Sequence, residues 1–278
     1  MMIHNEIDWG NNMYIISIII EKNKSVAALY DKEYKLLAKK EGADASKLCL
    51  DLIAESGISA ADVDYIGVVA DSSSAADIEN GTGIKCYTSS VMGARALGEA
   101  YLANDVPFAV LLKIDDTVEC GLVMDKKIYS GVNGQGVNVA NMVIDFGGYE
   151  CCSCGRRGCF KAYASNAGLK RIASDCGVAD ADLTHKALFA MNTPEAENAK
   201  KLYVEYLASG ITNIINLFQP NEFILEGPFT EVGDALMAPL MEIILREQYT
   251  HSMPNKCNIR FAKNAEDTAL LGGALLGR

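Results

Sequence analysis

The chain has 278 residues, of which 50% are hydrophobic and 22% charged, and its formal net charge is −11 at pH 7. This composition is typical of a globular protein with a full core, and the acidic balance argues against a nucleic-acid surface, which needs Lys and Arg gathered on one face. The first residues are not a basic stretch followed by an apolar core, and the apolar run 13–20 is too short to cross a bilayer. We therefore expect a cytoplasmic protein that binds neither nucleic acid nor a membrane.

The first third of the chain reads as strands followed by helices. Its hydrophobic pattern predicts strands over 13–20, 24–30, 34–39, 63–69 and 84–88, helices over 46–56 and 91–103, and a polar loop or short helix over 71–83. Asp44 is a suitable N-cap for the first helix, because its carboxylate can accept a hydrogen bond from the first turn.

A second block with the same order begins after residues 104–107. It contains predicted strands over 108–114, 118–124, 127–130, 142–146, 222–225 and 258–262, a Gly- and Asn-rich loop over 131–136, and helices over 194–218, 231–247 and 267–276. Thr193 and Pro194 suit the start of the long helix, and Pro220 ends it. Two α/β blocks fit this order better than a single sheet.

Cysteines gather at one point of the second block. The chain has 9 cysteines, and Cys151, Cys152, Cys154 and Cys159 lie close together in the sequence. A disulfide framework distributes its pairs along a small secreted chain, whereas a cluster in a reducing compartment indicates metal or thiol chemistry.

The motif around this cluster resembles a known family. Residues 152–165 read C-S-C-G-R-R-G-C-F-K-A-Y-A-S, which is similar to the C-x-C-G-x-x-G-C-[LF]-E-A-Y-A-S motif of the ROK (repressor, open reading frame, kinase) family. Further segments resemble the family in the same order: A-R-A-L-G-E at 94–99, the segments 127–134 and 211–220, and the closing helix around 269–274.

The resemblance implies an α/β fold of the actin-like ATPase (ribonuclease H-like) type, with two domains and a cleft between them. The N-terminal domain is then expected over 1–106, completed by the C-terminal helix 266–278. The C-terminal domain is expected over 107–265 and carries the cysteine cluster.

The phosphate-binding loops of the family are altered in this chain. The family hairpin D-x-G-G-T-K corresponds to Ile19, Glu21, Lys22, Asn23 and Lys24, so both glycines are lost. The second loop, G-T-G, corresponds to Asp115, Asp116 and Thr117, which place carboxylates where a phosphate is expected. The adenosine loop G-G-G becomes Glu226-Gly227-Pro228. We therefore expect neither ATP nor Mg²⁺ to bind.

The catalytic and sugar positions depart as well. The family's Asn-Asp pair, which holds the base, corresponds to Ser90 and Val91, and valine cannot accept a proton. The Glu and His of the family's G-E-I-G-H become Asn138 and Asn141, and the Glu after the last cysteine becomes Lys161. Ser90, Asn138, Asn141 and Lys161 are the substrate-cleft residues that the resemblance implies, and no catalytic residue is expected.

In the family, three cysteines and the His of G-H bind one Zn²⁺. Cys152, Cys154 and Cys159 match these cysteines, while Asn141 replaces the histidine and is a poor zinc ligand. Cys151 or a water is then the fourth ligand. The alternative is a set of reduced structural thiols. If zinc binds, we expect a structural role.

Three functions remain open. The first is a ROK-family sugar-kinase-like protein that has lost kinase activity and has a binding or regulatory role. The second is an active ATP-dependent kinase of hexoses with relocated catalytic residues, and the third is an unrelated enzyme that uses the Asp115/Asp116 pair or the thiols. Residues 1–12 are too few for the winged helix of family repressors, and family members often dimerise, so we expect a homodimer without a DNA-binding module.

Overall fold

The structure is a computed structural model that describes residues 13–22, 24–70, 72–134, 136–148, 154–248 and 256–278. The chain divides into two compact units, residues 1–98 with 264–278 (unit 1) and residues 99–263 (unit 2). The domain boundaries expected from the sequence, at residues 106 and 266, stay a prediction.

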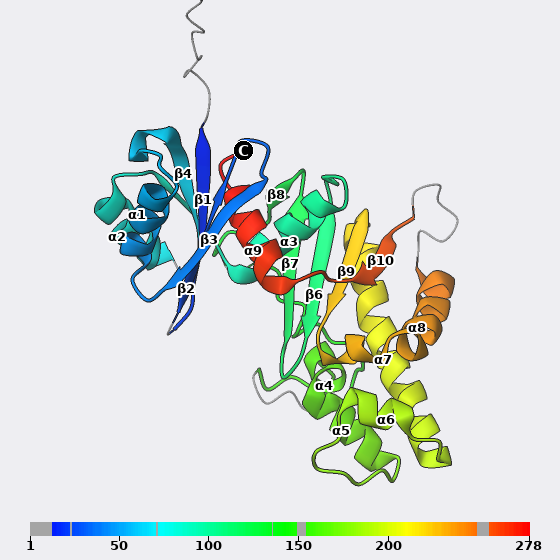
Figure 1. Ribbon diagram of the computed structural model, residues 1–278. Helices are drawn as coiled ribbons and strands as arrows, with labels where there is room; N and C mark the ends of the chain where they lie inside the picture. Colours follow the sequence, from blue (N-terminus) through cyan, green and yellow to red (C-terminus); the bar gives the residue numbers. More distant parts are fainter. Residues whose placement is uncertain (1–12, 23, 71, 135, 149–153, 249–255) are drawn as a thin grey trace, which may run out of the picture. The chain divides into compact units, whose positions relative to one another are not determined.

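Unit 1 is built on a mixed five-stranded sheet (Figure 1). Its strands are β1 (Tyr14–Ile20), β2 (Ser25–Tyr30), β3 (Leu36–Gly42), β4 (Val63–Val69) and β5 (Cys86–Ser89), in the order β3-β2-β1-β4-β5. The first three strands are antiparallel neighbours, whereas β4 runs parallel to β1 and β5 parallel to β4. Because β1 is buried on both faces, it reads as a continuous apolar run.

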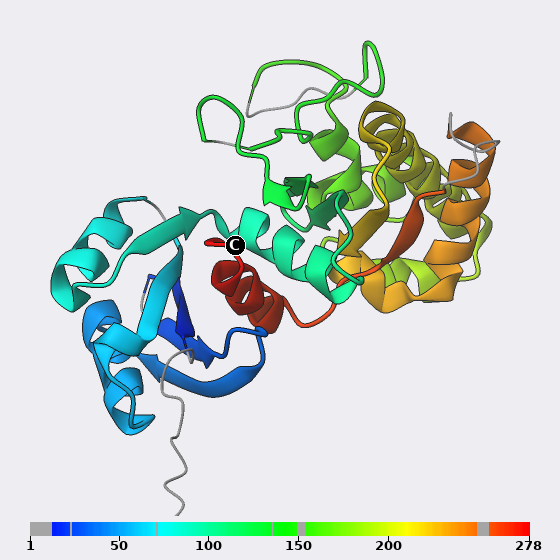
Figure 2. The same cartoon turned by 90° about the horizontal axis from the view of Figure 1, so that it is seen from above.

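Helices cover both faces of this sheet. Helices α1 (Ala45–Glu55) and α2 (Ser72–Thr82) lie on one face and α9 (Ala265–Ala274) on the other, as Figures 1 and 2 show. The Asp44 carboxylate accepts a hydrogen bond from Lys47 N at 2.9 Å, so the predicted cap of α1 is confirmed. A short 3-10 turn, η1 (Ala60–Asp62), precedes β4, and α3 (Val91–Leu102) includes the residue at which unit 1 passes into unit 2.

Unit 2 has a second mixed five-stranded sheet. Its strands are β6 (Ala109–Ile114), β7 (Val118–Met124), β8 (Lys127–Ile128), β9 (Glu222–Glu226) and β10 (Asn258–Phe261), in the order β10-β9-β6-β7-β8. β7 is antiparallel to β6 and β8, and β9 is parallel to both β6 and β10.

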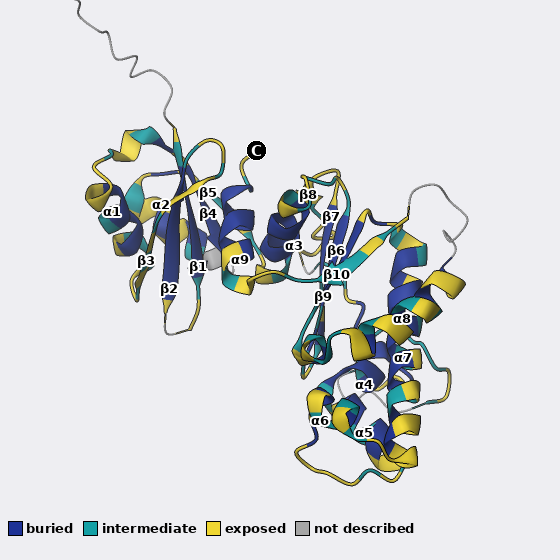
Figure 3. Ribbon diagram, turned by 45° about the vertical axis from the view of Figure 1, so that its right-hand side comes forward, coloured by how far each residue is buried: buried dark blue, intermediate teal, exposed yellow. Residues whose placement is uncertain are grey.

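The helices of unit 2 complete one large core with this sheet. They are α4 (Phe160–Ala164), α5 (Asn166–Asp175), α6 (His185–Ala190), α7 (Pro194–Phe218), the 3-10 turn η2 (Pro228–Val232) and α8 (Asp234–Glu247). α7 has the predicted bounds, with Thr193 Oγ1 accepting from Ala196 N at 3.2 Å. Its buried stripe includes Leu207, Ile211 and Ile214, and Figure 3 shows its outer side exposed. None of the helices in the described ranges is long and apolar enough to cross a membrane.

Two predicted elements differ from the structure. Residues 142–146 form no strand, only the single bridge between Val143 and Cys159. The ladder cannot continue, because helix α4 begins at Phe160 on the partner segment. The predicted helix 231–247 begins only at Asp234, because Gly233 has φ 65° and separates η2 from α8.

Candidate functional site

The β1–β2 turn of unit 1 holds the first altered phosphate loop. Glu21 N donates to Lys24 O at 2.9 Å and closes the turn, while Asn23 lies outside the described residues. Lys24 Nζ lies 2.9 Å from Glu41 Oε1 of β3. The hydrogen bond to Glu41 raises the pKa of Lys24 above its ordinary value. The ammonium group of Lys24 is therefore paired within the sheet of unit 1.

The expected base position lies at the N-terminus of α3 in unit 1. Ser90 Oγ accepts from Gly93 N at 3.1 Å, and Ser90 O accepts from Ala94 N at 3.0 Å, so Ser90 caps the helix. Val91 is the first residue of the helix and is 44% exposed. This position thus presents an apolar side chain that cannot take up a proton.

Residues 115–117 form a closed turn between β6 and β7 in unit 2. Asp115 N donates to Thr117 O at 2.9 Å, and Thr117 N donates to Asp115 Oδ1 at 3.0 Å. Lys113 Nζ lies 2.8 Å from Asp115 Oδ2. Partial burial disfavours the Asp115 carboxylate, but the hydrogen bonds from Lys113 and Thr117 outweigh it and lower the pKa of Asp115. Asp115 is therefore an ionised group at this turn.

The first residue of α5 braces the same turn from a second side. Asn166 N donates to Asp115 O at 2.8 Å, and Asn166 Nδ2 donates to Asp116 Oδ1 at 2.9 Å. Both carboxylates thus have partners from unit 2 itself. Side chains of the turn, of β6 and of α5 hold the turn in shape. A glycine loop, in contrast, would leave its backbone open to a phosphate.

Gly227, the surviving glycine of the adenosine loop, packs against the end of β6. Its φ is 140°, and a Cβ at this position would clash with the carbonyl oxygen of Ile114. Only glycine permits this close approach, so the packing of unit 2 is itself a sufficient reason for the residue.

The expected sugar-contact residues of unit 2 lie near one another. Asn138 Oδ1 accepts from Asn141 N at 3.4 Å, and Lys161 N donates to Ala140 O at 3.0 Å. Arg156 Nη1 reaches Asn141 O at 3.5 Å. The backbone pairing of 140–143 with 159–161 therefore brings the segment of Asn141 beside Lys161, and Asn138 is linked to Asn141. Ser90 belongs to unit 1 and is described there.

The two cysteines of the motif that the structure describes, Cys154 and Cys159, lie at a spacing that fits a shared metal ion. Cys154 Sγ and Cys159 Sγ are 3.5 Å apart, well beyond the roughly 2.05 Å of a disulfide bond. Two thiolates bound to one tetrahedral zinc at about 2.3 Å each are roughly 3.8 Å apart, which is close to the observed spacing. Cys151 and Cys152 lie outside the described residues, and no group of three or more metal-ligating side chains occurs within the described ones.

Gly158 fixes the course of the chain between these cysteines. It has φ 72°, and a Cβ here would clash with the carbonyl oxygen of Asp145. A zinc ion at Cys152, Cys154 and Cys159, as the resemblance implies, would cross-link this loop; of these cysteines, the structure describes Cys154 and Cys159.

One buried polar cluster of unit 2 was not predicted from the sequence. Glu99 is fully buried, and its carboxylate accepts from Arg260 Nη1 and from Lys263 N, each at 2.7 Å. Arg260 Nε also binds Glu222 Oε2 at 2.9 Å. The Glu99 of the A-R-A-L-G-E segment is therefore a structural residue, and no local sequence pattern links it to Arg260, which is 161 positions away.

His185 forms a second buried polar contact in unit 2. Its Nε2 lies 2.8 Å from the Tyr203 hydroxyl, which donates to Ala164 O at 2.9 Å. Because the phenol has one hydrogen, Nε2 of His185 is the donor of their shared bond. Burial lowers the pKa of His185 to about 4. A neutral histidine in this position holds α6 to α7.

Known proteins resemble the chain in sequence. A family model described as "ROK family" matches residues 53–278. A putative xylose repressor from Caldicellulosiruptor is 26% identical over 194 residues, which are 63% of this chain and 48% of that protein. A xylose repressor from Bacillus spizizenii is 32% identical over 50% of this chain and 35% of its own length. A glucokinase from Halalkalibacterium halodurans is 28% identical over 65% of this chain and 60% of its own length. The chain thus spans less than two thirds of these relatives.

Solved structures share the fold across almost the whole chain. A ROK hexokinase from Thermus thermophilus superposes with a TM-score of 0.78 at 21% identity, covering 95% of this chain and 97% of that one. A ROK transcriptional regulator described as a homologue of the Escherichia coli MLC protein superposes with a TM-score of 0.72 at 18% identity, covering 95% of this chain and 77% of that one. The expected α/β fold of the actin-like ATPase type is confirmed, and the chain belongs to the ROK family.

Proposed function

We propose that this ROK-family protein has lost sugar phosphorylation and acts by binding, in a regulatory role. The observation that carries the proposal is the turn at residues 115–117. The family resemblance assigns this turn to a phosphate loop, and the turn carries two carboxylates that Lys113 and Asn166 hold in place.

The electrostatics of this turn disfavour a nucleotide. Two unit charges of the same sign 4 Å apart repel by about 4 kcal/mol at the effective dielectric of a protein surface. Lys113 offsets part of the charge of Asp115, while Asp116 is bound only through a neutral amide of Asn166 among its described contacts. A γ-phosphate would therefore meet net repulsion at this turn.

The loss of the base supports the same proposal independently. Proton removal by a general base contributes roughly 10²–10⁴ to the rate of such a reaction. Val91 cannot supply it, and its neighbour Ser90 is engaged as the helix cap. The relatives bear the names of xylose repressors as well as of glucokinases, which is compatible with a regulatory role of this fold.

An active hexose kinase with relocated catalytic residues is the second candidate. The observation that favours it is the 28% identity to a glucokinase over 202 residues.

Two measurements distinguish these candidates. A coupled ADP-release assay over a panel of hexoses, with the Thermus thermophilus ROK hexokinase as the positive control, is expected to show no turnover. In a thermal-shift experiment, ATP–Mg²⁺ is expected to leave the melting temperature unchanged, because only a ligand that binds the folded state stabilises it. Hexose-dependent ADP release by this chain would refute the proposal.

A paired variant tests the electrostatic reason. The D115N/D116N variant keeps the size of both side chains and removes both charges. A shift with ATP–Mg²⁺ that appears only in this variant supports repulsion as the cause. If ATP–Mg²⁺ changes the melting temperature of neither the wild type nor the variant, the altered β1–β2 hairpin is sufficient to explain why the nucleotide does not bind.

We further propose that Cys152, Cys154 and Cys159 bind one structural zinc ion, with Cys151 or a water as the fourth ligand. The 3.5 Å separation of the Cys154 and Cys159 sulfurs supports this site. Metal analysis of the purified protein is expected to find one zinc per chain, and a folded, metal-free preparation would contradict it. A homodimer, proposed from membership in the family, is checked by light scattering.

A further inference from the structure

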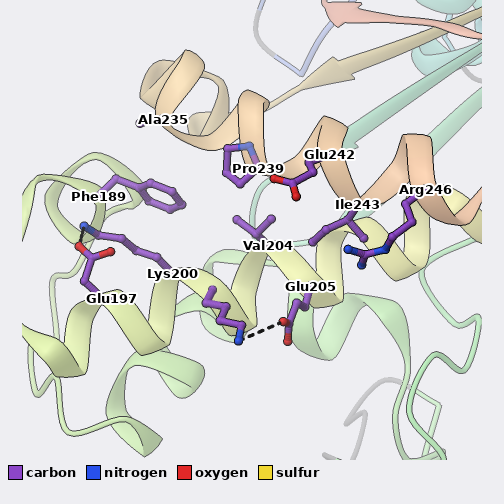
Figure 4. A pocket seen from close by; sticks show the side chains of 11 residues that line it. Phe189, Glu197, Lys200, Val204, Glu205, Ala235, Pro239, Glu242, Ile243 and Arg246 are labelled. Carbon is purple, nitrogen blue, oxygen red and sulfur yellow. Dashed lines mark hydrogen bonds and ion pairs between the residues drawn. The ribbon is translucent and has the colours of Figure 1, made fainter.

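A pocket of about 370 Å³ lies in unit 2. Helices α7 and α8 form its sides, and Phe189 of α6 closes one end (Figure 4). Val204, Pro239 and Ile243 add to its apolar wall. This volume lies within the range of small-molecule pockets in proteins, which begins at about 300 Å³.

Each positively charged side chain that lines the pocket lies near a carboxylate. Lys200 Nζ lies 2.6 Å from Glu197, and Lys201 Nζ lies 4.0 Å from Glu205. Arg246 Nη2 lies 2.9 Å from Glu247. A ligand that carries a negative charge would have to compete with a carboxylate for each of these cations.

Glu242 has no such partner. In Figure 4, the Glu242 side chain extends from α8 toward Val204 of α7. Among the residues that the structure describes, no Lys, Arg or His lies within ion-pair distance of it, and it takes part in no hydrogen bond. Within the part of the chain that the structure describes, Glu242 is therefore an exposed carboxylate without a paired cation, and it lies beside an apolar wall.

Pro239 interrupts the hydrogen bonding of the same helix. A proline inside a helix has no N–H, so it cannot donate to the carbonyl four residues earlier, which is that of Ala235. Ala235, Pro239, Glu242 and Ile243 follow one another at helical spacing and all line the pocket. This side of α8 thus presents the Glu242 carboxylate next to the apolar ring of Pro239.

We propose that this pocket binds a small amphipathic amine. The ammonium group binds the Glu242 carboxylate, and an apolar or aromatic body packs against Phe189, Val204 and Ile243. Such a ligand, with one positive charge on an apolar body, complements a pocket in which the Glu242 carboxylate lies beside an apolar wall. The site lies entirely within unit 2 and does not depend on whether the protein phosphorylates sugars.

Three probes that share a phenyl group on a short chain test the charge requirement. The full-length chain, labelled with ¹⁵N, is titrated with 2-phenylethylamine, 2-phenylethanol and 3-phenylpropionate, and binding is followed by NMR. The amine is expected to bind saturably, the alcohol about fivefold more weakly, as for the loss of an exposed ion pair, and the carboxylate not at all. An amine that does not bind, or that binds no more tightly than the alcohol, overturns the proposal.

Matched variants locate the site. E242Q is expected to weaken amine binding about fivefold and to leave alcohol binding unchanged. E231Q removes the same charge from an exposed position of unit 2 outside the pocket and is expected to match the wild type. Because both side chains are exposed, neither substitution is expected to change the stability. Melting temperatures equal to that of the wild type show that both variants are folded. Unchanged amine binding in E242Q, or an equal loss in E231Q, overturns the assignment to this pocket.

Discussion

Substitution of Glu99 by glutamine is expected to destabilise unit 2 strongly. The glutamine keeps the shape of the side chain but replaces one carboxylate oxygen by an amide NH₂, which then faces either Arg260 Nη1 or the N–H of Lys263. One buried donor loses its acceptor and the buried ion pair is broken. Breaking such a pair costs about 3–5 kcal/mol, and we expect about 3 kcal/mol, because Arg260 is 22% exposed and keeps Glu222.

Urea unfolding followed by circular dichroism measures this loss. If the units unfold separately, it belongs to the transition of unit 2. E119Q is the matched control, because Glu119 is 44% exposed and pairs with Lys113 at 3.2 Å, so its loss is expected to stay below about 1 kcal/mol. An E99Q/R260Q double variant should lose less than the sum of the single variants. A loss below about 1 kcal/mol in E99Q would refute the reasoning.

Three further predictions rest on single contacts. His185 has a pKa of about 4 in the folded protein and of about 6.5 in the unfolded chain, so its contribution to stability is complete above pH 6.5. As the pH falls toward 4, the free energy of unfolding is expected to decrease by about 3 kcal/mol. In urea unfolding, H185Q should lack this part of the pH dependence, and identical profiles of the variant and the wild type would contradict the prediction. Gly227→Ala should destabilise the protein by about 3 kcal/mol, because the added Cβ would clash with the carbonyl oxygen of Ile114. Gly134→Ala is the control: Gly134 has φ 69° and open space around the added Cβ, so this change should cost about 1 kcal/mol. Equal losses of stability in the two variants would argue against the clash. C154S should lower the zinc content and the melting temperature together, while C120S, at a thiol outside the motif, keeps the zinc; zinc retained in full by C154S would exclude Cys154 as a ligand.

Local sequence patterns determined most of the secondary structure. Apolar runs predicted β1, β6 and β9, and the amphipathic stripe with Thr193 and Pro194 predicted the bounds of α7. These elements follow from interactions between residues close in sequence, namely helical periodicity, capping and proline stereochemistry. The resemblance to the ROK family then supplied the fold, which the solved structures confirm.

The candidate site could be predicted only as positions. The resemblance assigned Asp115, Asp116 and Val91 to the altered sites, but it could not show that Asn166 and Lys113 brace the turn at residues 115–117. The predicted strand 142–146 failed for a related reason. Whether an extended segment becomes a strand depends on its partner, and here the partner turns into α4 at Phe160.

The sequence by itself determined most of the helices and strands, and it showed the departures from the family motifs at the phosphate and base positions. The tertiary structure alone decided the Glu99–Arg260 pair, the buried His185–Tyr203 contact and the pocket beside Glu242. Each of these joins residues from separate elements of unit 2. Their chemistry depends on burial and on neighbours distant in sequence, and hydrophobic periodicity carries no information about either.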